Sequence, residues 1–237
     1  MIRRTIVLSI LALTSARELR AQVGYDPTHS PYRDLRETME LTLYSGWFSA
    51  RKDPAGVAPQ SGPIVGVHYQ WRASGPANLT ADIARVESQR RVLDPEKLST
   101  CTAAKDCKLI GTFRWPLYSA DAGLSMDLTG ARSFYRLVPT ARLGMGLLSD
   151  FHSASDVGQF TFGTRFAFSW GLGLRWMPVE RYQLRADLLN RFYSVNYPET
   201  YYTPADDASV IFTNRQSKSA WLNNPSFTIG LSYLFSR

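Results

Sequence analysis

The sequence predicts an all-β fold, an eight-stranded antiparallel up-and-down transmembrane β-barrel. Eight runs alternate between large apolar side chains and small or polar ones, which is the periodicity of a β-strand. The connections between these runs are alternately long and short, as in membrane barrels. No internal stretch approaches the roughly 18–20 consecutive apolar residues of a membrane-spanning helix. In lipid, only helices and closed barrels satisfy their backbone polar groups.

The N-terminus is typical of a signal peptide. Arg3 and Arg4 form a basic start, and the apolar run that follows is too short to cross a membrane. Ala21 is a small residue near which we expect cleavage. A buried N-terminal helix is the alternative, which the basic start and the abrupt polar continuation disfavour. The expected division is a signal peptide (1–21), a short periplasmic N-terminal segment (22–36) and an outer-membrane barrel domain (37–237).

The first four runs show the alternation clearly. They cover residues 37–50, 63–74, 77–92 and 116–129. Their apolar faces carry Leu41, Leu43 and Trp47, then Val65, Val67 and Trp71, then Leu79 and Ile83, then Leu124, Met126 and Leu128. The opposite faces carry mainly Gly, Ser, Thr and charged side chains, and the third run becomes rich in charged residues toward its end.

The last four runs show which face meets lipid. They cover residues 134–149, 163–177, 181–193 and 225–236. Their apolar faces carry Leu143 and Met145, then Phe166, Phe168, Trp170 and Leu172, then Leu184 and Leu188, then Phe227, Ile229 and Leu231. The other face is Gly, Ser and Thr with scattered Asp and Arg. A soluble barrel would turn its large apolar residues inward, so this pattern indicates a lipid-facing exterior around a polar interior.

The connections orient the barrel in the membrane. The long ones are 51–62, 93–115, 150–162 and 194–224, and the short ones are 74–77, 130–133 and 178–180. Outer-membrane barrels have short periplasmic turns and long extracellular loops, so we expect both termini in the periplasm. Aromatic residues should form a girdle at each interface, unless they only reflect the general preference of aromatics for strands. The girdle residues are Trp71, Trp176, Tyr182 and Tyr233 near the short turns, and Trp47, Tyr118, Phe166 and Phe227 near the long loops.

The polar face predicts a filled lumen. An eight-stranded barrel is just wide enough for its side chains to fill. The charged residues have both signs and should form a cross-linked network, since buried charges are tolerated when paired. The expected network is His68, Arg72, Asp82, Asp121, Asp127, Arg142, Arg165, Arg175, Arg185 and Asp187. The expected neighbours are His68 with Asp82, Arg142 with Ser119 and Asp121, and Arg175 with Arg185, whose repulsion Asp187 or an acid from another strand would offset.

The pattern resembles the small eight-stranded outer-membrane barrels of the OmpA/OmpX-like superfamily, over nearly the whole mature chain. The last run resembles the terminal strand signal that the barrel-assembly machinery reads, although Ser236 and Arg237 follow where that family usually ends on the aromatic itself. The signal residues are Phe227, Ile229, Leu231, Tyr233 and Phe235. The resemblance implies the bacterial outer membrane as location, and outer-membrane lipid and the assembly machinery as partners. It implies no activity, because this superfamily has diverse functions.

Two cysteines, Cys101 and Cys107, lie close together in a polar stretch. In an exported chain such a pair favours a loop disulfide over free thiols or a metal site. The formal net charge of +7 falls when the arginines of the signal peptide leave, and no nucleic-acid-binding motif is present, so we expect no nucleic-acid partner. We expect no cofactor and no metal, because the three histidines lie far apart, and we expect a monomer.

We therefore expect a non-enzymatic barrel with a structural or surface-binding role through its long extracellular loops. A narrow pore for ions or small solutes is one alternative. A lipid-A-modifying enzyme is another, through His68 with Asp82 or through His152 with nearby serines. Basic residues on the long-loop side could contact lipopolysaccharide phosphates, or could be a solvated surface of mixed charge. They are Arg51, Lys52, Arg90, Arg91, Lys97, Lys105, Lys108 and Arg114.

Overall fold

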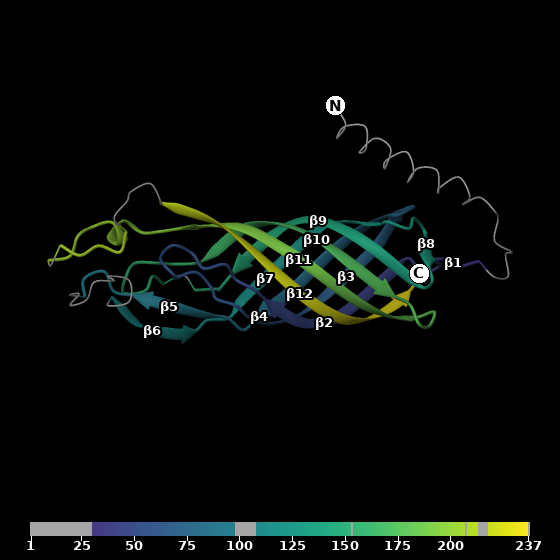
Figure 1. Ribbon diagram of the computed structural model, residues 1–237, viewed down its shortest axis with the longest axis horizontal. Coiled ribbons are helices and arrows are strands. Elements are labelled where there is room, and N and C mark those ends of the chain that lie inside the picture. The colour runs from purple at the N-terminus through teal and green to yellow at the C-terminus, as the bar shows by residue number, and fades with distance from the viewer. Residues whose placement is uncertain (1–29, 98–107, 153, 207, 213–217, 237) are drawn as a thin grey trace, which may run out of the picture.

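Eight antiparallel strands close into a barrel in the computed structural model, which describes residues 30–97, 108–152, 154–206, 208–212 and 218–236 (Figure 1). The barrel strands are β2 (Met39–Phe48), β3 (Gly62–Ser74), β4 (Ala77–Val86), β7 (Leu117–Asp127), β9 (Leu137–Ser149), β10 (Thr164–Trp176), β11 (Tyr182–Asn196) and β12 (Ser219–Phe235). Each pairs with the next barrel strand along the chain, and β12 closes the barrel by pairing with β2. The predicted eight-stranded up-and-down barrel is confirmed.

The pairing register sets the tilt of the strands. Stepping from Met39 of β2 through directly paired residues, strand by strand, leads round the barrel to Pro225 of β12. The carbonyl oxygen of Pro225 accepts a hydrogen bond of 2.8 Å from the N–H of Ser49. One circuit therefore climbs from position 39 to position 49, a shear of ten residues that tilts every strand against the barrel axis.

The last two strands are longer than the sequence predicted. β11 runs to Asn196 and β12 begins at Ser219, so the connection expected over 194–224 covers only 197–218. The expected start was Pro225, which has no N–H to donate to a ladder. In an antiparallel strand the N and C=O of one residue point the same way, and at Pro225 they face the end of β2. The missing N–H therefore interrupts no pairing.

The end with the long connections carries an extension beyond the barrel. The predicted third strand over 77–92 is in fact two, because β5 (Gln89–Leu93) leaves the barrel and pairs with β6 (Leu109–Arg114) as a separate hairpin. We call this hairpin, together with the connections 49–61, 150–163 and 197–218, the extracellular extension, after the side of the membrane on which we expect the long connections. It includes a short 3-10 helix, η2 (Glu199–Tyr201).

The opposite end, which we call the periplasmic end after the expected orientation of the barrel, is crossed by the N-terminal segment. β1 (Tyr32–Asp34) pairs with β8 (Arg132–Phe134), which lies in the connection between β7 and β9. The expected strand over 134–149 therefore begins only at Leu137. Arg72 of β3 donates a hydrogen bond of 2.7 Å to the carbonyl oxygen of Leu35, which ties the segment to the barrel mouth.

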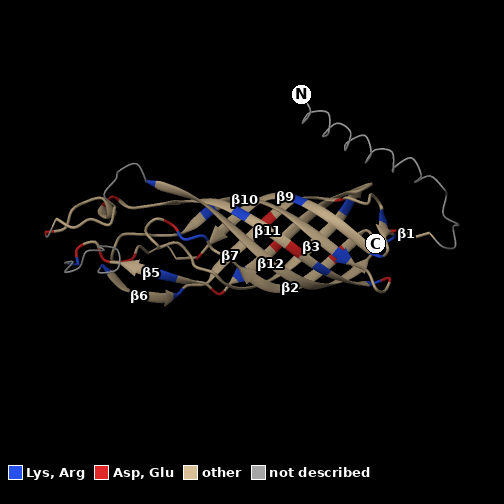
Figure 2. Ribbon diagram, viewed as in Figure 1, with Lys and Arg blue, Asp and Glu red and all other residues tan. Residues whose placement is uncertain are grey.

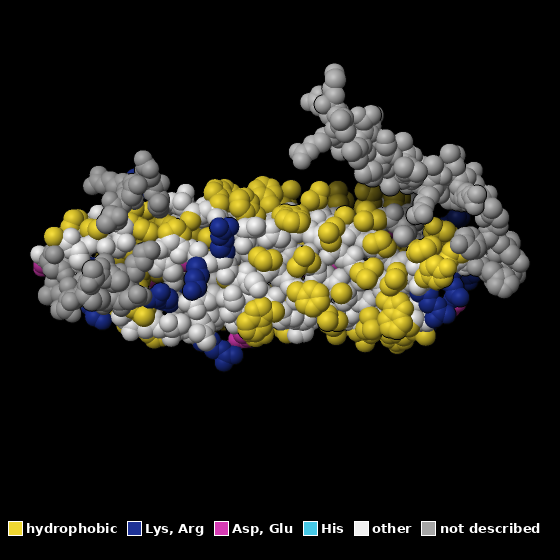
Figure 3. Space-filling model, viewed as in Figure 1, with side chains coloured by type: hydrophobic (Ala, Val, Ile, Leu, Met, Phe, Trp, Pro, Cys, Tyr) yellow, Lys and Arg dark blue, Asp and Glu magenta, His cyan; other side chains and the backbone are white. Residues whose placement is uncertain are grey.

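The outer wall is an apolar belt (Figure 3). Large side chains such as Leu172 and Ile229, 58% and 56% exposed, point away from the barrel on every strand. The residues that face inward between them are mostly small or polar. This arrangement is the reverse of a soluble barrel and gives the wall a lipid-facing surface. A closed barrel with such a belt is an outer-membrane β-barrel.

Among the described residues, no helix is both long enough and apolar enough to cross a membrane.

Candidate functional site in the barrel lumen

The lower lumen, near the short turns, is organised around Glu40 of β2. Its two carboxylate oxygens accept hydrogen bonds of 3.1 Å each from Arg175 and Arg185. These arginines are directly opposite one another on β10 and β11. Asp127 also pairs with Arg175, and Asp187 accepts a hydrogen bond of 2.6 Å from Nε of Arg185. The repulsion between the arginines is thus offset mainly by an acid from another strand.

The upper lumen is organised around Asp82 of β4. Tyr44 donates a hydrogen bond of 2.7 Å to one of its oxygens, and Arg142 and Arg191 lie 3.4 Å away. His68 is its cross-strand partner, with Nδ1 3.3 Å from Oδ2 of Asp82. A second acid, Asp121, lies 3.0 Å from Arg191. Basic and acidic positions accordingly alternate through the barrel in Figure 2.

Eight of the ten expected network residues meet in these two clusters: His68, Asp82, Asp121, Asp127, Arg142, Arg175, Arg185 and Asp187. The other two lie at the ends of the barrel. Arg165 is at the extracellular end of β10 and donates to the loop carbonyls of Thr161 and Phe162, so its place in the network was wrong. Arg72 lies at the periplasmic rim, where it lines the same pocket as Glu40 and Arg175 of the lower cluster and donates a hydrogen bond to Leu35.

The expected neighbours of Arg142 were also wrong. It lies opposite Ser125 of β7, not beside Ser119 and Asp121. The connection between β7 and β9 is longer than a four-residue turn, because it contains β8 and two residues with positive φ, Tyr135 (48°) and Arg136 (64°). The longer connection moves the point of reversal along the chain and shifts the register.

Glu40, Tyr44 and Arg191 are lumen residues that the sequence interpretation did not select. Their signal was present, since each shares the inward parity of its strand. Glu40 and Tyr44 alternate with Leu41 and Leu43, and Arg191 follows Arg185 and Asp187 at even spacing. Selecting every charged residue on the inward parity would have added Glu40 and Arg191, and Tyr44 shares that parity.

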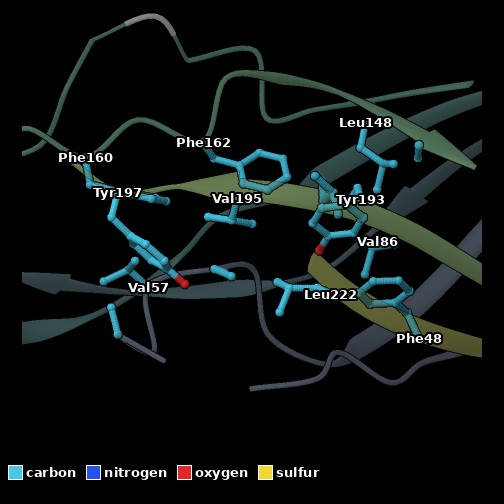
Figure 4. Close-up of a cluster of buried hydrophobic side chains, with 14 of the residues drawn as sticks. Phe48, Val57, Val86, Leu148, Phe160, Phe162, Tyr193, Val195, Tyr197 and Leu222 are labelled. Carbon is cyan, nitrogen blue, oxygen red and sulfur yellow. The ribbon is translucent and has the colours of Figure 1, made fainter. Parts of the chain in front are cut away.

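The extracellular end of the lumen is closed by apolar side chains (Figure 4). The inward row of each strand turns from polar to apolar at this end, with Phe48, Val86, Leu148 and Tyr193 as examples. The connections fold over them and add further side chains. Those labelled in Figure 4 from the connections are Val57, Phe160, Phe162 and Tyr197. We call this cluster the extracellular core; it closes the bore above the charged network.

One buried ion pair lies within the extension. Arg90 of β5 is 2% exposed and stacks over the rings of Trp115 and Phe160, at 4.5 and 5.2 Å. Asp156 lies 3.4 Å from it. Burial raises the pKa of the Asp156 carboxyl, whereas the hydrogen bond from the Phe160 N–H and the charge of Arg90 act to lower that pKa. Stacking and charge together hold β5 against the 150–163 connection.

A polar pocket of about 560 Å³ opens at the periplasmic mouth. It is bounded by the N-terminal segment and ends at Glu40 and Arg175 of the lower cluster. Gln183 lines it and is fully buried, and among the described residues its amide has no hydrogen-bond partner. The pocket is therefore a vestibule that ends at the network.

The histidines show no catalytic arrangement in the described part of the chain. His68 is 2% exposed inside the barrel, and no described serine reaches its Nε2. The ring of His152 contacts that of Trp115, with centroids 4.2 Å apart and the planes tilted by 40°, and its Nδ1 lies 2.6 Å from the carbonyl oxygen of Asp150. No cluster of three or more potential metal ligands occurs among the described residues. Cys101, Cys107 and the expected signal peptide lie outside those residues.

The expected girdle and assembly residues lie on the outer wall. Trp71, Trp176, Tyr182 and Tyr233 are exposed near the short turns, and Trp47, Phe166 and Phe227 near the long connections. Tyr118 is partly covered, by contacts with Phe151 and Arg85. The expected assembly signal lies on β12, the strand that closes the barrel on β2, with Phe227, Ile229, Leu231 and Tyr233 turned outward and Phe235 half-buried.

No family model and no curated protein matches this sequence. The fold is similar to that of Neisserial surface protein A (NspA), with a TM-score of 0.49 and 13% identity over 83% of this chain and 97% of that one. It is also similar to that of the outer membrane protein OprG from Pseudomonas aeruginosa, with a TM-score of 0.46 and 12% identity over 85% of this chain and 98% of that one. A third similar structure is that of a major outer membrane protein from Thermus thermophilus, with a TM-score of 0.41 and 7% identity over 83% of this chain and 99% of that one.

Proposed function

We propose that this outer-membrane barrel does not conduct and acts at the cell surface through its extracellular extension. The observation that carries the proposal is the double closure of the bore. The charged network fills the part within the apolar belt, and the extracellular core fills the part above it. Outer-membrane lipid surrounds the belt in this proposal, and the barrel-assembly machinery inserts the monomer.

The composition of the lumen argues against the alternative of a pore. Pores that select ions carry rings of one charge sign or small residues along their axis. Here cations and anions from facing strands are in direct contact, as Arg175 is with Glu40 and Arg191 with Asp121. Separating such buried pairs is unfavourable, because each charge would lose its partner.

The alternative of a lipid-modifying enzyme has less support. Such chemistry requires an accessible nucleophile or base at the lipid-facing wall. His68 points into the lumen, where Asp82 and Arg142 contact it. The surface histidine, His152, is occupied by Trp115 and by the Asp150 backbone. Neither arrangement offers an imidazole to a lipid acyl chain.

Planar bilayer recording of the purified full-length protein tests the proposal. We expect no stable single-channel currents, whereas a general porin reconstituted in the same bilayers should conduct. The fold of the sample is checked by heat-modifiable gel migration, because folded and boiled barrels migrate differently. Large, stable currents from the folded protein would contradict the proposal and favour the pore.

A further inference from the structure

A pocket of about 490 Å³ lies at the extracellular end between the β2–β3 connection and β5. Arg51 and Lys52 line it from the connection, and Arg91 lines it from β5. Arg51 and Lys52 are exposed, and no described residue forms an ion pair with either side chain. Three cations thus converge on one cavity.

The one acid in the lining is engaged in the fold of the connection. Asp53 is buried, and its Oδ1 accepts a hydrogen bond of 2.9 Å from the N–H of Ala58. Its Oδ2 accepts from the N–H groups of Gly56 and Val57 and from the hydroxyl of Tyr197, at 2.9–3.3 Å. The donors to Asp53 come from its own connection and from Tyr197. With the single carboxylate of Asp53 set against the three cations of the lining, the pocket has a net positive charge.

The connection that carries the cations is held in place. The N–H of Arg51 donates a hydrogen bond of 2.9 Å to the side chain of Asn224 on β12. The N–H of Ala50 donates one of 2.9 Å to the hydroxyl of Ser61. The N–H of Gln60 donates a hydrogen bond of 2.9 Å to the carbonyl oxygen of Gln89 on β5. A pocket fixed to neighbouring strands in this way loses little freedom when it binds a ligand, which favours affinity.

The height of the pocket indicates the source of the ligand. Arg51 lies four residues beyond Trp47, whose exposed ring is at the upper edge of the apolar belt. On the neighbouring wall Arg85 and Arg114 share the single carboxylate of Glu87, which leaves further positive charge. Figure 3 shows Lys and Arg side chains along this edge of the belt. Lipid headgroups lie at this level.

We propose that this pocket binds a phosphate group of an outer-leaflet glycolipid. Arg51 and Lys52 would donate charge-assisted hydrogen bonds to the phosphate oxygens, with Arg91 completing the positive lining. Phosphate suits the site because it presents several acceptors to several donors at once. The assignment rests on the proposed function only for the orientation of the extension toward the outer leaflet.

The test measures binding of bisphosphorylated lipid A to the full-length barrel in neutral-lipid nanodiscs, by titration calorimetry. Wild-type protein should bind it at least about tenfold more tightly than dephosphorylated lipid A, since hydrogen bonds to charged groups are among the stronger ones. The double variant Arg51→Glu and Lys52→Glu should lose that difference. Lys97→Glu makes a charge reversal on the same side but outside the pocket, and should retain it.

Inorganic phosphate distinguishes a lipid from a free phosphate. Millimolar phosphate that abolishes lipid A binding would assign the pocket to a soluble phosphate and overturn the lipid source. Equal lipid A affinity in wild type and the double variant would overturn the site itself. Currents from the same nanodisc-reconstituted protein, transferred to bilayers, would contradict the non-conducting function and leave the binding result standing, so the two failures are separable.

Discussion

At the scale of single residues, Glu40 holds the lower lumen together. It neutralises two arginines that face each other across neighbouring strands, and its side chain is almost fully buried. Breaking a buried pair by removing one partner is strongly destabilising, because an uncompensated charge remains. Glu40 matters more to this barrel than its position near the start of β2 suggests.

Glu40→Gln should therefore destabilise the folded barrel by about 3–5 kcal/mol, since Arg175 and Arg185 would lose their shared carboxylate. The measurement is urea unfolding in lipid vesicles, followed by tryptophan fluorescence and gel migration. Glu180→Gln is the matched control, because Glu180 is exposed at a periplasmic turn. Equal unfolding midpoints for the two variants would show that Glu40 does not bridge the arginines.

Residue contacts were predictable only where a short turn separated the strands. His68 and Asp82 are joined by the tight turn between β3 and β4, so the expected pairing matches the register. Arg142 follows a connection that contains β8, and its expected neighbours were wrong by several positions. Glu40 reaches across the lumen to β10 and β11, and such a contact depends on the closure and shear of the barrel rather than on local spacing.

At the scale of strands, β10 shows how closely the two faces differ. Leu172 points outward into the belt, whereas the adjacent Gly171 points inward against β11. A Cβ at Gly171 would lie 2.5 Å from the carbonyl oxygen of Leu188, so glycine is what lets these strands approach. Neighbouring positions should thus respond to substitution for different physical reasons.

Leu172→Arg should cost about 2–4 kcal/mol of stability in the membrane, the range for a cation near the bilayer midplane. Gly171→Ala should cost about 1–3 kcal/mol through crowding. Unfolding in vesicles of two acyl-chain lengths separates the causes, because only the arginine penalty should change with bilayer thickness. If Leu172→Arg were tolerated as well as Leu172→Ala, the assignment of the outer face would be inverted.

The extracellular extension provides a topological prediction. Protease added to intact cells should cut within the β5–β6 connection or within 197–218, and should spare the turn at Gly75. The reason is that the long connections lie on the opposite end of the barrel from the short turns (Figure 1). Fragments are read by mass spectrometry. Cleavage that requires rupture of the outer membrane would reverse the orientation.

The strands were largely predictable because a period of two persists through each of them. Their ends were less so. The last strand was expected to begin at Pro225, whereas β12 begins at Ser219, and the carbonyl oxygen of Pro225 bonds to Ser49 just past the end of β2. The charged end of the third expected strand was the signal that the chain leaves the belt, and β5 begins there as part of a separate hairpin.

At the scale of the whole molecule, the barrel changes its internal chemistry along its axis. Within the belt the wall is apolar and the lumen polar; above it, the lumen becomes an apolar core. Lipid surrounds the first part and water the second, so each part follows the rule of its own solvent. The sequence predicted the first part. The second was missed because its inward apolar residues come from strand ends and connections that meet only in three dimensions.

This division predicts that either closure is sufficient to prevent conduction when the other is opened. Arg142→Ala widens the network, but Phe48 and Tyr193 still fill the bore above it. Phe48→Ala with Tyr193→Ala opens the extracellular core, but Glu40, Arg175 and the other network residues still fill the bore below. Neither variant should conduct in planar bilayers once gel migration shows that it is folded.

Stable currents from folded Arg142→Ala would show that the extracellular core does not seal the lumen. Currents from the double variant alone would show that the charged network leaks and that the apolar core is the only barrier.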